Sequence, residues 1–344
     1  MTEQLIQWYS ENKRQLPWRS TKNPYKIWVS EIILQQTQIK TGISYYERFI
    51  RYFPDIASLA RTNDIEVLKI WEGLGYYNRA LNMLSTAKII MSKYNGKFPE
   101  EYNELIKLKG VGIYTAAAIS SICFNNQIGV VDGNVYRVLS RIYDITDPIN
   151  HSSAKKKFQE IANQLVPKNN PGIYNQAIMD FGSIHCKKHN PKCGGCPINK
   201  KCLAFEKNTI EMRPVKIIKQ KIKTRYFNYL FIEQNGHFLI QKRIDADIWN
   251  GLYQLPLIET KKKIKQAKLI QDLFLRSFEI NNIQNIYNTN HNLSHQILKI
   301  SFWKLNVLKL MRKPYFKKIN AKEIINYPFP VPIKQFFHIV HTKV

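Results

Sequence analysis

Apolar residues recur three and four positions apart through much of the first part of the chain, which places them along one face of a helix. The clearest examples are 27–38, 43–52, 65–74 and 114–124. Turn-forming residues such as Phe53-Pro54-Asp55 separate these segments. The spacing therefore predicts a mainly α-helical region over residues 1–207.

The pattern changes after residue 207. Residues 213–223 are basic, contain a proline and show no helical periodicity, so we interpret 208–224 as a linker. Beyond it, short apolar runs predict strands, a helical pattern follows, and residues 225–344 form a second domain of α+β type. The expected elements are strands at 225–232, 237–242 and 296–305 and a helix at 264–278.

The chain has 344 residues, enough for two or three domains, and a formal net charge of +27. Such an excess of positive charge attracts polyanions such as nucleic acid. An AT-rich genome, which favours Lys, Asn and Ile codons, explains the charge equally well. The sequence has no apolar run long enough for a membrane span and no signal-peptide layout at its start, so we expect a cytoplasmic protein.

Four of the five cysteines fall between residues 186 and 202, with the spacing C-x6-C-x2-C-x5-C, and Cys123 stands apart in an apolar stretch, where we expect it to be buried. Four thiolates so close in sequence can surround one metal centre, and both zinc and iron–sulfur clusters accept four cysteines. Zinc sites more often pair two C-x2-C units, and this loop has one. The spacing favours a [4Fe–4S] cluster and leaves zinc open. The ligands are Cys186, Cys193, Cys196 and Cys202.

Gly110-Val111-Gly112 predicts a turn between two helices, where glycines allow positive φ and the next helix N-terminus favours a phosphate. Twenty residues on, Asp132 follows an apolar segment and precedes Gly133, which makes it either a functional carboxylate or a plain helix N-cap. Both interpretations stay open on the residues alone.

Glu31 lies among large apolar residues of a predicted helix. Burial there raises the pKa of its carboxyl group, and a carboxyl that is neutral at physiological pH can donate a proton. The alternative is an exposed helix acid. The amides and hydroxyl of Gln35, Gln36, Thr37 and Gln38 follow it and suit either base recognition or helix capping.

Together these segments resemble the helix-hairpin-helix glycosylase superfamily, the group with endonuclease III, and within it the MutY family of adenine glycosylases. The resemblance is strong over residues 4–206 and weaker over 225–305. The motifs that carry it are LPWR (16–19), SEIILQQTQ (30–38), GLGYYNRA (73–80), LKGVGIYTA (108–116), VDGNVYRVL (131–139), the cysteine loop and NLSH (292–295).

The resemblance implies catalytic roles. Glu31 corresponds to the general acid that protonates adenine, Asp132 to the carboxylate that stabilises the sugar cation, and Tyr114 to a tyrosine beside them. Bifunctional lyases of the superfamily carry a nucleophilic lysine where this chain has Tyr114, and Lys109 lies outside that position. A monofunctional glycosylase is therefore expected.

The resemblance also implies binding residues. Those expected to line the adenine pocket are Trp18, Arg19, Leu34 and Gln176, although Trp18 and Leu34 also suit an ordinary core. Those expected to contact DNA or 8-oxoguanine are Gln36, Thr37, Leu74, Tyr76, the hairpin residues Gly110, Val111 and Gly112, and Ser294 with His295. Leu293 stands where the family has an aromatic residue, which weakens the expected grip on the lesion.

The second domain resembles the MutT/Nudix-like domain of the same family, through the turn Trp249–Pro256. A Nudix box would follow with a glycine and several glutamates, but residues 258–270 offer Glu259 alone, so no pyrophosphate hydrolysis is expected. Residues 306–344 match no pattern.

The resemblance as a whole predicts a monomeric bacterial enzyme of base excision repair, acting on duplex DNA with adenine opposite 8-oxoguanine or guanine. Two alternatives are less consistent with the sequence. A thymine-glycol or mismatch-thymine glycosylase/lyase is disfavoured by Tyr114 and by the second domain. An iron–sulfur DNA-binding protein without activity would lack Glu31 or Asp132, and both are present.

Overall fold

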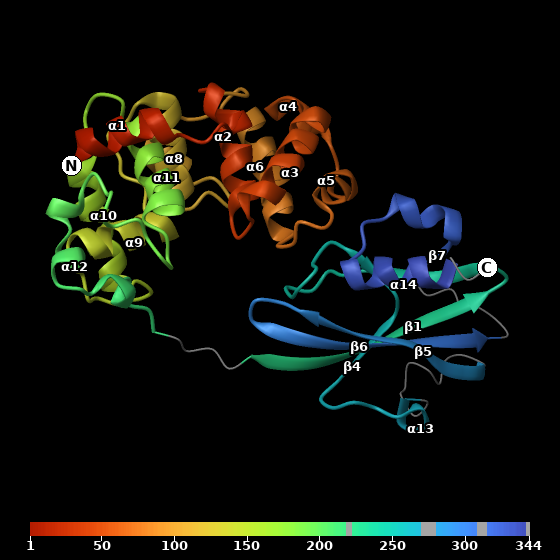
Figure 1. Ribbon diagram of the computed structural model, residues 1–344. Coiled ribbons are helices and arrows are strands. Elements are labelled where there is room, and N and C mark those ends of the chain that lie inside the picture. Colours follow the sequence, from red (N-terminus) through yellow and green to blue (C-terminus); the bar gives the residue numbers. More distant parts are fainter. Residues whose placement is uncertain (218–221, 270–279, 308–314, 342–344) are drawn as a thin grey trace. The chain divides into compact units, whose positions relative to one another are not determined.

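A computed structural model of the chain (Figure 1) describes residues 1–217, 222–269, 280–307 and 315–341. Its contacts divide it into two units. The first is Met1–Arg61 with Asn82–Ile218, and the second is Thr62–Leu81 with Lys219–Val344. None of the described helices combines the length and the apolar character needed to cross a lipid bilayer.

Residues 1–207 are helical, as the periodicity predicts. The helices are α1 (Thr2–Asn12), α2 (Pro24–Leu34), α3 (Ile39–Tyr52), α4 (Ile56–Arg61), α5 (Asp64–Trp71), α6 (Asn78–Lys93), α7 (Tyr102–Leu105), α8 (Ile113–Phe124), α9 (Gly133–Ile142), α10 (Ser152–Leu165), α11 (Pro171–Asp180) and α12 (Leu203–Glu206). Short 3₁₀ segments lie at Pro17–Ser20, Asn199–Lys201 and Ile210–Met212, and a π-helical turn, Phe181–His185, continues α11.

Local sequence fixes where α2 begins. The side chain of Asn23 accepts a hydrogen bond from the Lys26 backbone N–H at 3.2 Å, and Pro24 occupies the first turn, where its missing N–H costs nothing. Helix α8 is buried on every side over Thr115–Ile122, since both α2 and α11 pack against it. The layer formed by α2, α8 and α11 positions the site described below.

The second unit holds a mixed sheet of the order β3-β2-β1-β6-β5, in which β1 runs parallel to β6 and the other pairs are antiparallel. β4 also pairs with β1, and β7 with β2. The strands are β1 (Lys223–Gln234), β2 (His237–Lys242), β3 (Tyr253–Gln254), β4 (Leu257–Thr260), β5 (Ile280–Asn292), β6 (Gln296–Val307) and β7 (Lys317–Asn320).

Both faces of this sheet are covered, with α13 (Gln266–Leu269) and α14 (Val331–His341) on opposite sides (Figure 1). Phe336 of α14 stacks on Phe302 of β6 with ring centroids 4.2 Å apart, and on the other face Leu269 joins the core around Leu230 and Trp303. Coverage on both sides explains why residues 227–232 of β1 are buried without alternation.

The predicted strands at 225–232, 237–242 and 296–305 are confirmed, while the sequence did not predict β3, β4, β5, β7 and α14. Of the helix expected at 264–278, α13 is described and residues 270–279 lie outside the described residues. The same holds for residues 218–221 of the expected linker.

The grouping of Thr62–Leu81 with the sheet is a further feature that the sequence did not reveal. Within this unit, Glu72 accepts a hydrogen bond from the Phe329 backbone N–H at 3.2 Å and pairs with the Lys334 ammonium group. Lys242 of β2 lies 3.3 Å from the Asp64 carboxylate. These contacts join residues far apart in sequence, which no local pattern records.

Candidate active site

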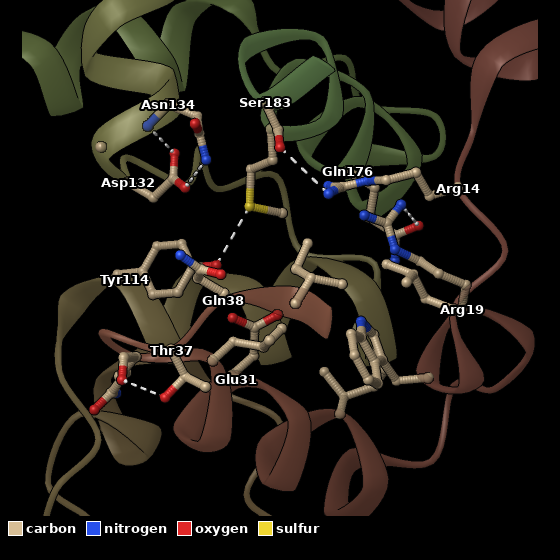
Figure 2. A pocket seen from close by; sticks show the side chains of 18 of the residues that line it. Arg14, Arg19, Glu31, Thr37, Gln38, Tyr114, Asp132, Asn134, Gln176 and Ser183 are labelled. Carbon is tan, nitrogen blue, oxygen red and sulfur yellow. Dashed lines mark hydrogen bonds between the residues drawn. The ribbon is translucent and has the colours of Figure 1, made fainter. Parts of the chain in front are cut away.

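A cavity of about 740 Å³ opens in the first unit, where α2, the start of α8, the start of α9 and α11 meet. Figure 2 shows Asp132 and Asn134 at one side of it and Arg14 and Arg19 at the opposite side. The predicted residues that the cavity brings together are Trp18, Arg19, Glu31, Leu34, Gln36, Thr37, Tyr114, Asp132 and Gln176. Trp18 is buried, as expected of a core residue, and it also forms part of the cavity wall, while its contact with adenine stays a prediction.

Glu31 lies on α2 with only 7% of its surface exposed, so the alternative of an exposed helix acid is wrong. Burial is the largest influence on its carboxyl group and raises the pKa to about 7. A hydrogen bond from Tyr114 and the charge of Arg19 act against this rise, and the nearby charge of Asp132 adds to it. Glu31 therefore holds or releases a proton near neutral pH.

Asp132 is the N-cap of α9, as one of the two interpretations predicts, and it also lines the cavity, while its catalytic role stays a prediction. One carboxylate oxygen accepts hydrogen bonds from the backbone N–H groups of Asn134 at 2.9 Å and Val135 at 2.8 Å. The other accepts from the Asn134 side-chain amide at 2.8 Å. Burial raises the pKa of this carboxyl group, whereas the hydrogen bonds to it favour the charged form.

Tyr114 is the second residue of α8, directly after the hairpin turn, and its hydroxyl lies 3.3 Å from the Met179 sulfur. Burial raises the pKa of its phenol well above the ordinary value. The side chain is therefore a neutral hydrogen-bonding group beside Glu31 (Figure 2).

The hairpin turn has the backbone expected of it. Gly110 has φ +78°, and a Cβ there would stand 2.8 Å from Asn82 Cβ, so a side chain is excluded both by conformation and by space. Val111 is buried, while Gly112 caps α8 with open space beside it. The N-terminus of α8 is thus open to a close approach by an anion.

The side of the cavity opposite Asp132 carries a polar network that the motifs indicated only in part. Gln176 accepts hydrogen bonds from Tyr9 at 2.9 Å and from Arg19 at 3.2 Å. Arg19 also donates to Asp180 at 3.0 Å, and Arg14 pairs with the same carboxylate. Arg14 and Asp180 were not predicted, because no spacing rule links residues that meet only in the folded chain.

The four clustered cysteines line one small pocket with the aliphatic and aromatic side chains around it. Arg141, which is almost fully buried, donates to Cys186 Sγ at 3.3 Å and to the backbone oxygen of Lys187 at 2.7 Å. Cys202 Sγ lies 3.4 Å from the Arg141 backbone oxygen. Among the described residues, no three His, Cys, Asp or Glu side chains are placed to hold a single metal ion. Cys123, which was expected to be buried, is only half-buried.

Residues expected at the DNA and lesion side belong to both units. Gln36 and Thr37 lie in the first, and Leu74, Tyr76, Ser294 and His295 in the second. Within the second unit the Tyr76 hydroxyl donates to the Ser294 hydroxyl at 3.0 Å, and Ser294 Oγ lies 3.2 Å from His295 Nδ1. Gln36 and Tyr76 both have positive φ, +58° and +49°, a left-handed conformation that is uncommon outside glycine.

Comparison with known proteins agrees with this geometry. Residues 29–166 match the family model described as "HhH-GPD superfamily base excision DNA repair protein", and residues 228–338 match the NUDIX domain. A thermostable thymine-DNA glycosylase has a similar structure, with a TM-score of 0.56 and 29% identity over 60% of this chain and 95% of its own. Endonuclease III in a complex with DNA shares the fold, with a TM-score of 0.52 and 23% identity over 60% of this chain and 94% of its own.

The helical part is therefore that of a base excision DNA glycosylase. An adenine DNA glycosylase of Buchnera aphidicola (subsp. Acyrthosiphon pisum) is 38% identical over 324 residues, which are 93% of this chain and 89% of that protein. The chain belongs to the MutY family of adenine DNA glycosylases.

The raised pKa of Glu31 predicts a pH-dependent stability. Below pH 4.5 the folded and unfolded chains both hold this proton, whereas between pH 4.5 and about 7 only the unfolded chain releases it. The Glu31 proton therefore stabilises the fold at low pH. The free energy of unfolding falls by roughly 3 kcal/mol in total as the pH rises through this range. Urea unfolding measures this effect in wild type and Glu31→Gln at pH 4.5 and pH 8. The free energy of unfolding of the variant, relative to that of wild type, should be higher at pH 8 than at pH 4.5. An equal difference at both pH values contradicts the buried, proton-holding carboxyl.

Proposed function

We propose that this chain is a monofunctional glycosylase that removes adenine paired with 8-oxoguanine or guanine in duplex DNA. The observation that carries the proposal is the buried Glu31 carboxyl group, with a pKa raised to about 7, in one cavity with the helix-capping Asp132. Two carboxyl groups held in unlike surroundings are the arrangement that cleavage of a glycosidic bond requires.

The adenine must first leave the base stack and enter the cavity, since its reacting atoms are out of reach inside the duplex. Protonated Glu31 then donates its proton to N7 of adenine. The bond from the sugar carbon to N9 breaks, and its electron pair leaves with the neutral base. The Asp132 carboxylate faces the resulting sugar cation, and water adds to the sugar carbon with loss of a proton.

Tyr114 decides between base removal alone and cleavage of the strand. A lyase needs an amine to form a Schiff base with the sugar. The neutral phenol at this position lies in the cavity beside Glu31 and cannot form one. The DNA strand therefore stays intact at an abasic site.

We propose that Gln36 and Tyr76 enter the base stack near the oxidised guanine, since both have suitable backbone conformation and exposure. Gln36 is exposed and Tyr76 is 48% exposed, and each is held in the left-handed conformation. Backbone strain of this kind gathers at functional sites. Tyr76 is bonded to Ser294, which supports a shared role at the oxidised guanine.

We also propose that Cys186, Cys193, Cys196 and Cys202 hold one [4Fe–4S] cluster. They surround one pocket, and the buried Arg141 guanidinium compensates the charge of thiolates. A single tetrahedral zinc ion would need sulfurs roughly 3.8 Å apart, whereas the corners of a cluster bind thiolates farther from each other. The bound cluster would cross-link the loop 186–202.

Base release from duplexes with adenine opposite 8-oxoguanine, guanine, cytosine or thymine tests the reaction. Single-turnover release is expected opposite the first two, with no strand cleavage and no adduct after borohydride treatment. Glu31→Gln and Asp132→Asn should each slow release by at least about 100-fold, because each removes one of the two carboxyl groups. Glu160→Gln, an exposed acid on α10, should match wild type. Normal release by Asp132→Asn contradicts the mechanism.

The hydrogen bond between Tyr76 and Ser294 predicts an effect on mispair preference. Tyr76→Phe and Ser294→Ala should each lower the ratio of adenine release opposite 8-oxoguanine to that opposite guanine. The exposed Ser92→Ala serves as the control, since its hydroxyl contacts only its own helix. If both variants keep the wild-type ratio, the proposed sensing role is wrong.

Purified protein should be yellow-brown and hold iron and sulfide in equal amounts. Cys196→Ser should lose colour and iron, and Cys123→Ser, which changes the one cysteine outside the loop, should keep both. Colourless wild-type protein with one zinc ion per chain contradicts the cluster. Metal analysis and the visible spectrum give the answer.

A further inference from the structure

Asp180 is the last residue of α11, and no part of the reaction described above uses it. Its side chain has no exposed surface, yet it is ionisable and lies beside the cavity wall. A buried carboxylate is costly unless other groups compensate it. Two arginines do so, because Arg14 and Arg19 both pair with the same oxygen of Asp180.

This arrangement fixes both guanidinium groups. Arg14 donates to Asp180 Oδ1 through Nε at 3.1 Å and to the Ser183 hydroxyl at 3.3 Å. Arg19 donates to the same oxygen through Nη2 at 3.0 Å, which leaves Nη1 for Tyr9 and Gln176. Removing Asp180 would leave two partly buried cations close to each other without their shared anion.

The consequence reaches Gln176, one helical turn before Asp180 on α11. The Tyr9 hydroxyl accepts from Arg19, so its single proton goes to Gln176 Oε1 at 2.9 Å. Arg19 Nη1 donates to that same oxygen at 3.2 Å. Both lone pairs of the amide oxygen then accept hydrogen bonds. The network therefore fixes the positions of the oxygen and the NH₂ group of the Gln176 amide.

Gln176 lines the cavity, so its NH₂ group is the end left to meet a ligand. A donor held in this way suits a ring nitrogen with a lone pair. Adenine offers N1 and N3 besides N7, whereas guanine carries a hydrogen on N1 and an amino group beside it. Two donors facing each other in a dry pocket would be unfavourable.

We propose that Asp180 is a positioning residue for base selection, which anchors Arg14 and Arg19 so that the Gln176 NH₂ group faces a ring nitrogen of the bound adenine. The inference rests on the proposed function, because it takes the cavity to be the adenine site. It assigns a specificity role to a carboxylate that touches neither the base nor the sugar.

Single-turnover release from duplexes that carry adenine, 1-deazaadenine or 3-deazaadenine opposite 8-oxoguanine tests it. Each analogue replaces one ring nitrogen by C–H. Wild type should release one of the two analogues about 10- to 100-fold more slowly than adenine, as expected for a lost hydrogen bond in a buried site. In Asp180→Asn the rate of adenine release should fall. The ratio of the release rate of adenine to that of the same analogue should approach one.

The ratio comes from a single preparation, so it does not depend on how much of the variant is folded. Asp144→Asn is the matched control, since Asp144 is also largely buried and pairs with Arg213 at 2.7 Å, and its ratio should equal that of wild type. Binding of an uncut duplex should be unchanged in Asp180→Asn. The proposal is overturned if Asp180→Asn keeps the rate ratio of wild type. It is also overturned if wild type releases both analogues as fast as adenine. Failure of wild type to release adenine at all would instead overturn the proposed function.

Discussion

Burial of one carboxyl group, that of Glu31, is the constraint on which the rest of the site depends. A buried charged carboxylate is unfavourable, so the group keeps its proton up to about pH 7. This requires α2 to be covered almost completely, and its residues from Tyr25 to Ile33 are buried apart from Lys26. The helices that cover it are α3 and α8, and α8 brings Tyr114 into the same cavity.

The two carboxyl groups of the cavity differ through their backbone surroundings. Glu31 lies inside a helix, where the N–H groups are already used by the helix itself. Asp132 precedes a helix and accepts hydrogen bonds from two backbone N–H groups and one side-chain amide. These hydrogen bonds favour the charged form of its carboxylate. Local structure thus separates an acid that holds a proton from a carboxylate that can face a cation. The same logic, applied to Asp180 and its two arginines, explains how a third buried acid can orient a neutral amide.

The helices of the first part, the hairpin and the pairing of Glu31 with Asp132 and Tyr114 could be predicted, because each has a local pattern or a motif. Arg14, Asp180 and Met179 could not, since they meet the site only through the packing of α11 against the chain's start. Residues 280–292 read as polar and asparagine-rich, yet they form β5, because pairing with β6 compensates their weak strand preference. The grouping of Thr62–Leu81 with the sheet depends on contacts between distant residues, such as Glu72 with Lys334.

The fold itself, before any substrate binds, holds the Glu31 carboxyl group protonated up to about pH 7. The most direct measurement is a ¹³C NMR titration of protein labelled at glutamate side-chain carboxyl carbons, with Glu31→Gln used to assign the resonance. We expect the Glu31 signal to titrate near pH 7. A titration at or below pH 4.5, the ordinary value for glutamate, would contradict it.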